Sequence, residues 1–222
     1  MAVEVKICGI MTPEHGRAAV AAGADYIGLV FAPSRRQIML PQAQTIVAAV
    51  RDASRSSLAV RIVGVFVNEQ PQAINQLAAE LGLDWVQLSG HESLASAAAI
   101  ERPVVKAIRF DGEPSEADWL AQLDHGVSGY PLLVDAHVAG SFGGAGVTGD
   151  WQQAAGLARR WPIWLAGGLK PDNVAQAVQV VQPQIVDVSS GVETGGTKDV
   201  AKIEMFIRAA RQAGAAAPVS AV

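Results

Sequence analysis

The chain has 222 residues and a mass of 23.1 kDa, and its 50% hydrophobic and 17% charged residues exclude an intrinsically disordered protein. Its 17 Lys and Arg against 21 Asp and Glu give a net charge of −4, so no nucleic-acid partner is expected. The single cysteine excludes an intramolecular disulfide, and no apolar run reaches the roughly 18 residues of a membrane helix. We therefore expect a cytoplasmic globular protein that does not bind a membrane.

Short apolar runs rich in β-branched residues recur along the chain and predict strands covered on both faces, as in a parallel sheet. These runs are Val3–Cys8, Tyr26–Phe31, Ile62–Val67, Trp85–Leu88, Val104–Ile108, Leu132–Asp135, Ile163–Ala166 and Ile185–Ser189. The stretches between them have helical spacing and are Pro13–Ala22, Pro41–Arg51, Pro71–Leu81, Glu92–Ile100, Ser115–Leu123, Asp150–Arg160, Pro171–Val181 and Lys198–Arg211. Four of these predicted helices open with proline, which is favoured in a first helical turn.

The eight strand–helix units follow one another without a composition break, so one domain is expected over residues 1–211. Strict alternation predicts right-handed crossovers, and eight units in about 210 residues favour an α/β fold, the (β/α)₈ TIM barrel. A doubly wound open sheet is the alternative, although it usually has five or six strands. Residues 212–222 are rich in small side chains and are expected to form a frayed tail.

In such barrels the chemistry lies at the C-terminal ends of the strands. Cys8 ends the first strand on the same face as Lys6, and its thiol is a candidate base if a nearby cation lowers its pKa; the alternative is a small buried hydrophobe. Asp135 ends the sixth strand with no helix directly after it, which favours a catalytic carboxyl over a helix cap. The glycine-rich residues Ala139–Trp151 are interpreted as a mobile cover over the site.

Two glycine clusters, Ala166–Leu169 and Ser189–Gly191, end the seventh and eighth strands, where barrels usually bind phosphate. Turn glycines are the alternative interpretation. Arg35 and Arg36 follow the second strand, and one of them is a candidate clamp for a carboxylate, although surface charge is the default for paired arginines. These features predict a small anionic substrate that carries a phosphate. The four histidines show no metal-ligand spacing, so neither a metal nor a redox cofactor is expected.

Several segments match one family, and three of their motifs, KxCG, AGGL and VDVSSGVE, are jointly specific for it. The matching segments are Lys6–Gly9 (KICG), Ala22–Phe31, Ser34–Arg36, Val63–Asn68, Val86–Leu88, Leu165–Leu169 (LAGGL) and Val186–Glu193 (VDVSSGVE). Through these segments the chain resembles the N-(5′-phosphoribosyl)anthranilate isomerases of tryptophan biosynthesis, and the resemblance extends to about Arg211.

The resemblance implies a cofactor-free Amadori rearrangement of an aminoaldose into an aminoketose. Asp135 would be the general acid that opens the furanose ring, and Cys8 the general base that removes the C2′ proton, so that their pKa values must move apart. Arg36 would hold the anthranilate carboxylate. The other substrate-binding residues that the resemblance implies are Gln87 and the four that would present backbone N–H groups to the phosphate, namely Gly167, Gly168, Ser190 and Gly191.

Three positions depart from the family pattern: Ser89 replaces a histidine, Ala145 a threonine and Gly149 a phenylalanine. These changes bear on catalytic efficiency and on the fit of the anthranilate ring. The alternatives are another phosphosugar isomerase, epimerase or lyase on the same barrel, and a non-enzymatic barrel that binds a phosphorylated ligand. Either a monomer or a homodimer is expected.

Overall fold

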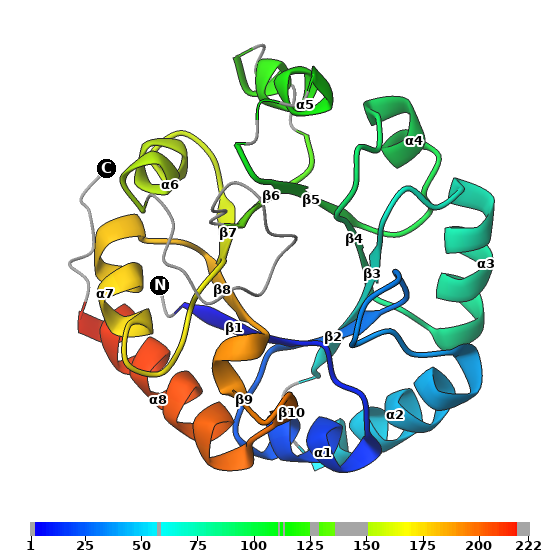
Figure 1. The fold of residues 1–222 in the computed structure, drawn as a ribbon, viewed down its shortest axis with the longest axis vertical. Helices are drawn as coiled ribbons and strands as arrows, with labels where there is room; N and C mark the ends of the chain where they lie inside the picture. The colour runs from blue at the N-terminus through cyan, green and yellow to red at the C-terminus, as the bar shows by residue number, and fades with distance from the viewer. Residues whose placement is uncertain are drawn as a thin grey trace.

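A computed structural model describes residues 3–56, 59–110, 112, 114–124, 129–135 and 151–216, in which eight parallel strands close into a barrel in chain order (Figure 1). The strands are β1 (Glu4–Cys8), β2 (Tyr26–Val30), β3 (Arg61–Phe66), β4 (Trp85–Leu88), β5 (Val104–Ile108), β6 (Leu132–Asp135), β7 (Ile163–Ala166) and β8 (Ile185–Val188). The predicted (β/α)₈ barrel is confirmed. The open-sheet alternative is wrong because β8 pairs with β1 and closes the sheet.

Helices surround the barrel and cover the outer face of the sheet (Figure 1). They are α1 (Pro13–Ala21), α2 (Leu40–Ala53), α3 (Pro71–Leu81), α4 (Leu94–Ala98), α5 (Pro114–Asp124), α6 (Trp151–Ala158), α7 (Val174–Val181) and α8 (Val200–Ala216), with the 3₁₀ helices η1 (Ser54–Ser56) and η2 (Ser190–Val192). A short antiparallel hairpin, β9 (Glu193–Thr194) and β10 (Thr197–Lys198), follows η2. No helix among the described residues is both long and apolar enough to cross a membrane.

Apolar side chains pack in two layers, one on each face of the sheet. The outer layer joins strand residues such as Ile7 to helix residues such as Ile46, both fully buried. The inner layer fills the barrel near the first residues of the strands, where the rings of Tyr26 and Trp164 lie 5.1 Å apart between centroids. Because this layer plugs the N-terminal end of the barrel, ligand chemistry is left to the C-terminal end.

At α7 and α4, which begin later than the periodicity predicts, side chains cap the preceding turns. The Asn173 side chain accepts a hydrogen bond from the Lys170 N–H and donates one to the Gly168 carbonyl, so Pro171 lies in a turn before α7. At α4, Ser93 accepts from a backbone N–H in the first turn, and the helix starts at Leu94.

The C-terminal helix differs from the prediction at both ends. Lys198 lies in β10 and not in the helix, and α8 continues to Ala216 with Ala213 buried. The predicted tail therefore begins too early, since residues 212–216 are helical, while 217–222 lie outside the described residues. The glycine-rich cover predicted after Asp135 also lies outside them, apart from Trp151, which begins α6.

Candidate active site

A cavity of about 570 Å³ opens at the C-terminal ends of the strands. Seven of the eight predicted site residues line it, namely Cys8, Arg36, Gln87, Asp135, Gly167, Gly168 and Ser190. Gly191 does not belong to the lining. It packs against the loop after β7, where a Cβ at this position would lie 1.8 Å from the carbonyl oxygen of Leu169. Its missing side chain instead lets the loops after β7 and β8 pack against each other.

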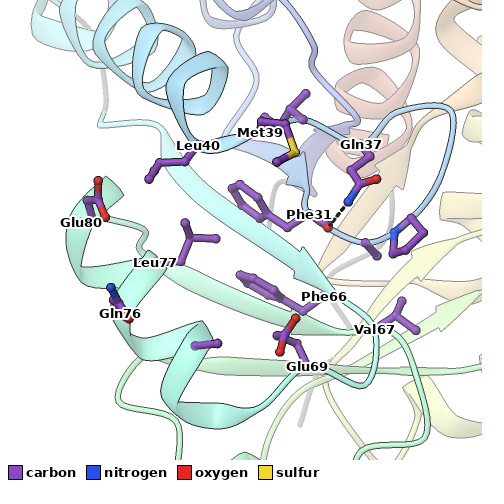
Figure 2. A pocket seen from close by; sticks show the side chains of 14 residues that line it. Phe31, Gln37, Met39, Leu40, Phe66, Val67, Glu69, Gln76, Leu77 and Glu80 are labelled. Atoms are coloured by element: carbon purple, nitrogen blue, oxygen red, sulfur yellow. Dashed lines mark hydrogen bonds between the residues drawn. The ribbon is translucent and has the colours of Figure 1, made fainter.

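A second cavity of about 400 Å³ lies between α3 and the segment that joins β2 to α2 (Figure 2). The stacked rings of Phe31 and Phe66 line it together with Met39. Its charged lining groups are the carboxylates of Glu69 and Glu80, and none of the described residues that line it is Lys, Arg, His or Cys. An anionic phosphosugar does not suit this surface, so the barrel mouth is the candidate active site.

The Cys8 thiol ends β1, where the side chain is nearly buried. Gly28 is its neighbour on β2, and a Cβ there would lie 2.7 Å from Cys8 Sγ, so the glycine makes room for the thiol. Burial raises the pKa of the Cys8 thiol; the Asp187 carboxylate adds to the rise, while the Lys6 and Lys198 ammoniums oppose it. The condition set for a basic thiol, that a nearby cation bring its pKa below the ordinary value, is therefore not met by Lys6 and Lys198, because desolvation and the Asp187 carboxylate together outweigh both cations.

Buried polar side chains form a chain across the barrel interior. The fully buried Lys6 Nζ donates to Asp187 Oδ2 at 2.8 Å and to Gln87 Oε1 at 2.9 Å. Gln87 Nε2 in turn donates to Ser89 Oγ at 3.0 Å. Burial alone would lower the pKa of Lys6, but Asp187 and Cys8 outweigh burial and raise it. Lys6 is therefore an ammonium that faces Cys8.

Asp187 is a site residue that sequence reasoning missed. It lines the cavity and is a direct register partner of Lys6 across the β1–β8 pair. The signal that could have found it is alternation along β8, which puts Asp187 and Ile185 on one face, combined with closure of the barrel onto β1.

Asp135 ends β6, where it is half-buried and lines the cavity. Since three strand pairings separate β6 from β1 around the barrel, Asp135 and Cys8 approach the cavity from different sides. An acid and a base on different sides of one bound molecule are suited to proton transfer at two of its atoms. No three His, Cys, Asp or Glu side chains of the described residues are grouped so as to hold a metal ion.

The loops after β7 and β8 offer backbone donors to an anion. Gly167 and Gly168 have φ values of 86° and 61°, a left-handed conformation that favours glycine. No hydrogen bond between described residues uses the backbone N–H of Gly168 or Ser190, and both residues line the cavity. Such N–H groups at a cavity wall can bind a phosphate.

The two arginines after β2 differ in position. The Arg36 side chain is 12% exposed and lines the cavity, whereas the Arg35 side chain is 57% exposed and is not part of the lining. This difference favours Arg36 as the carboxylate clamp. Both arginines contact Glu193 on β9, which also binds Lys198, and sequence reasoning gave neither of these two residues a role.

The chain matches the family model described as N-(5′-phosphoribosyl)anthranilate (PRA) isomerase over residues 5–209. The chain belongs to this isomerase family. An N-(5′-phosphoribosyl)anthranilate isomerase from Roseiflexus sp. (strain RS-1) is 54% identical over 213 residues, which cover 95% of this chain and 99% of the relative. The family resemblance read from the sequence is thereby confirmed.

Solved isomerase structures share the fold over 95% of the chain. Phosphoribosyl anthranilate isomerase from Thermotoga maritima is 37% identical with a TM-score of 0.81, covering 95% of this chain and 99% of that one. A phosphoribosyl anthranilate isomerase in complex with reduced 1-(o-carboxyphenylamino)-1-deoxyribulose 5-phosphate is 37% identical with a TM-score of 0.77 and the same coverage.

Of the three departures from the isomerase pattern, Ser89 can be located. Its hydroxyl accepts from the Gln87 amide and its carbonyl accepts from Arg109, so it continues the chain of polar side chains that starts at Lys6. Ala145 and Gly149 lie outside the described residues.

Proposed function

We propose that this chain is a cofactor-free phosphoribosylanthranilate isomerase that converts N-(5′-phosphoribosyl)anthranilate into 1-(o-carboxyphenylamino)-1-deoxyribulose 5-phosphate. The observation that carries the proposal is that Cys8 and Asp135 line one cavity whose wall also presents Arg36 and backbone N–H groups that no hydrogen bond between described residues uses. This combination fits a molecule with a carboxylate at one end, a phosphate at the other, and a reacting sugar between them.

Asp135 carries out the first chemical step in this proposal. As a carboxylic acid it donates its proton to the ring oxygen O4′. The C1′–O4′ bond breaks with its electron pair going to O4′, and the nitrogen lone pair forms the C1′=N bond of a cationic Schiff base.

Cys8 carries out the second step as a thiolate. It removes the proton from C2′, and the electrons of that C–H bond form a C1′=C2′ double bond while the C1′=N electrons return to nitrogen. The resulting enolamine becomes the ketone when C1′ gains a proton and O2′ loses one. The cationic Schiff base beside the sulfur favours the thiolate and opposes the burial that raises the pKa of Cys8.

The two steps need only one proton on the Cys8–Asp135 pair, held by Asp135 at the start. The form that holds this proton on Cys8 instead has the same net charge, so the two forms interconvert without a change in the charge of the cavity. Coupled acid–base pairs titrate together in this way. The Lys6 ammonium, which Asp187 keeps charged, stabilises the thiolate form.

The two ends of the substrate are held by different loops. Arg36 binds the anthranilate carboxylate, and the N–H groups of Gly168 and Ser190 bind the phosphate, with those of Gly167 and Gly191 beside them. Fixing both ends holds C1′ and C2′ between acid and base, which removes most of their freedom before reaction. We further propose that the enzyme is cytoplasmic and works as a monomer or a homodimer.

The test follows the loss of anthranilate fluorescence when freshly generated phosphoribosylanthranilate is added to the wild-type protein, Cys8→Ser and Asp135→Asn. We expect rapid turnover by the wild type and a loss of at least about 100-fold in either variant, the typical contribution of a general acid or base. Glu80→Gln, which changes the lining of the second cavity (Figure 2), is the matched control and should keep full activity. Near-normal turnover in a variant removes that residue from its role, and an inactive, folded wild type directs attention to other phosphosugar substrates.

A further inference from the structure

One carboxylate next to the cavity is surrounded by three cations. Glu193 Oε1 accepts from Arg36 Nε at 2.6 Å and from Lys198 Nζ at 2.9 Å. Glu193 Oε2 accepts from Arg36 Nη2 at 3.0 Å and from Arg35 Nη2 at 2.8 Å. Three positive charges on one negative charge leave the cluster at +2, and Arg36 makes both bonds of a two-pronged guanidinium–carboxylate contact.

The cluster is a built feature of the fold. Glu193 and Lys198 are direct partners across the β9–β10 hairpin, and their side chains are 5% and 3% exposed. Burial alone would raise the pKa of Glu193, but hydrogen bonds from Arg36 and Lys198 outweigh it and lower the pKa. Glu193 is therefore a buried carboxylate whose hydrogen bonds fix the guanidinium plane of Arg36.

Arg36 is confined from a second direction by Gly9 at the end of β1. A Cβ at Gly9 would lie 2.4 Å from Arg36 Cδ, so the arginine stem crosses directly over this glycine. The bonds to Glu193 use Nε and Nη2, and no hydrogen bond between described residues uses Nη1. Nη1 of the fixed Arg36 guanidinium, on the cavity wall, is therefore available to donate hydrogen bonds to a ligand.

We propose that Glu193 is a positioning residue that holds Arg36 in the orientation that recognises the aromatic carboxylate of the substrate. The β9–β10 hairpin then serves as a specificity element, since it supplies Glu193 and its buried partner Lys198. This inference rests on the proposed function, because it assigns the carboxylate of the substrate to Arg36.

Charge and position predict opposite effects when Glu193 is replaced by Gln. The substitution raises the cluster from +2 to +3, which by charge alone strengthens the binding of an anion. However, each Glu193 oxygen accepts one bond from Arg36, so either orientation of a Gln amide turns its NH₂ group toward an Arg36 donor. Arg36 loses one of its two anchors, and positioning therefore predicts weaker binding of the carboxylate.

The experiment measures binding by calorimetric titration with two ligands. The first is reduced 1-(o-carboxyphenylamino)-1-deoxyribulose 5-phosphate, and the second is the same compound without the ring carboxyl group. We expect Glu193→Gln to weaken the first ligand about tenfold or more, the size of one charge-assisted contact, and to leave the second within about twofold. Arg35→Gln is the matched control, because it removes a cation from Glu193 that does not line the cavity, and both affinities should stay within about twofold.

Glu193→Asp provides a second variant that keeps the charge but draws the carboxylate back by one methylene. Positioning predicts that it also loses affinity for the carboxylated ligand alone, whereas a pure charge role predicts no change. Equal losses for both ligands, tighter binding by Glu193→Gln, or a wild type that does not prefer the carboxylated ligand would each overturn the proposal. Turnover of phosphoribosylanthranilate by the wild type tests the proposed function separately, so the two failures can be told apart.

Discussion

Replacing Asp187 with Asn should destabilise the barrel at neutral pH, because it leaves the Lys6 ammonium unpaired in the interior. Lys6 is 0% exposed and contacts Asp187 Oδ2 at 2.8 Å, and Asp187 Oδ1 has no partner among the described residues, so one oxygen carries the ion pair. The substitution keeps the shape and one acceptor but removes the negative charge. Removing one partner of a buried ion pair typically costs about 3–5 kcal/mol in the free energy of unfolding.

The loss has an upper limit, because Lys6 can fold without its proton. An unfolded lysine has a pKa of about 10.4, so deprotonating it at pH 7 costs about 4.6 kcal/mol, and at pH 9 only about 1.9 kcal/mol. In the variant, burial depresses the folded pKa of Lys6, and the unfolded chain then binds more protons than the folded one. Stability must therefore rise with pH above the depressed folded pKa and up to about 10.4, a rise that the raised Lys6 pKa of the wild type does not produce.

Urea unfolding of both proteins at pH 7 and pH 9 measures this effect. With an m value of about 3 kcal/mol/M, the variant should have a midpoint about 1–1.5 M below that of the wild type at pH 7, and less than about 0.7 M below it at pH 9. Glu14→Gln, which removes the partner of Arg17 in a pair 71% and 51% exposed, is the matched control and should not shift the midpoint. A deficit of equal size at both pH values would refute the argument from a buried charge.

Two further predictions concern the thiol. Gly28→Ala brings a Cβ within 2.7 Å of Cys8 Sγ, so the sulfur must move, and kcat should fall about 10- to 100-fold, whereas an unchanged kcat in the same fluorescence assay would contradict this. Burial raises the pKa of Cys8 above its ordinary 9.0. The one proton that Cys8 and Asp135 share, and that Asp135 needs for the first step, therefore stays bound to this pair at mildly alkaline pH. The alkaline fall of kcat/KM should therefore be centred above pH 9, and a midpoint below pH 8 would show that the pair holds its proton less tightly than we infer.

Strand positions were predictable from the sequence because each strand is a short apolar run buried on both faces. The bounds of β4, β5, β6 and β7 agree with the predicted ones, those of β1, β2 and β8 differ by one residue at one end, and β3 is shifted by one residue at both ends. Helix starts were less predictable, because they depend on single side-chain contacts. The Asn173 side chain makes hydrogen bonds within the turn before α7, and the spacing of hydrophobic residues carries no information about such contacts.

The candidate site was predictable where position along a strand decides it. Cys8 and Asp135 end strands, and in a barrel all strand ends meet at one mouth. The ion pairs around the site were not predictable from spacing within a segment, because they depend on closure of the barrel, which joins segments far apart in the chain. The Lys6–Asp187 pair and the Arg36–Glu193 pair join residues 181 and 157 positions apart, and periodicity within a segment carries no register between segments.

The raised pKa of Cys8 bears on the mechanism. Counting neighbouring cations suggests a thiolate, but the desolvation of the thiol and the Asp187 carboxylate together act more strongly than Lys6 and Lys198. A thiol that keeps its proton is a poor nucleophile, so the same burial limits its reaction with oxidants and electrophiles. The reactive form therefore holds the one proton of the Cys8–Asp135 pair on Asp135, and the thiolate gains a positive partner once the ring has opened to the cationic Schiff base. Because C2′ is acidic only beside the C1′=N bond of that Schiff base, the acid acts before the base.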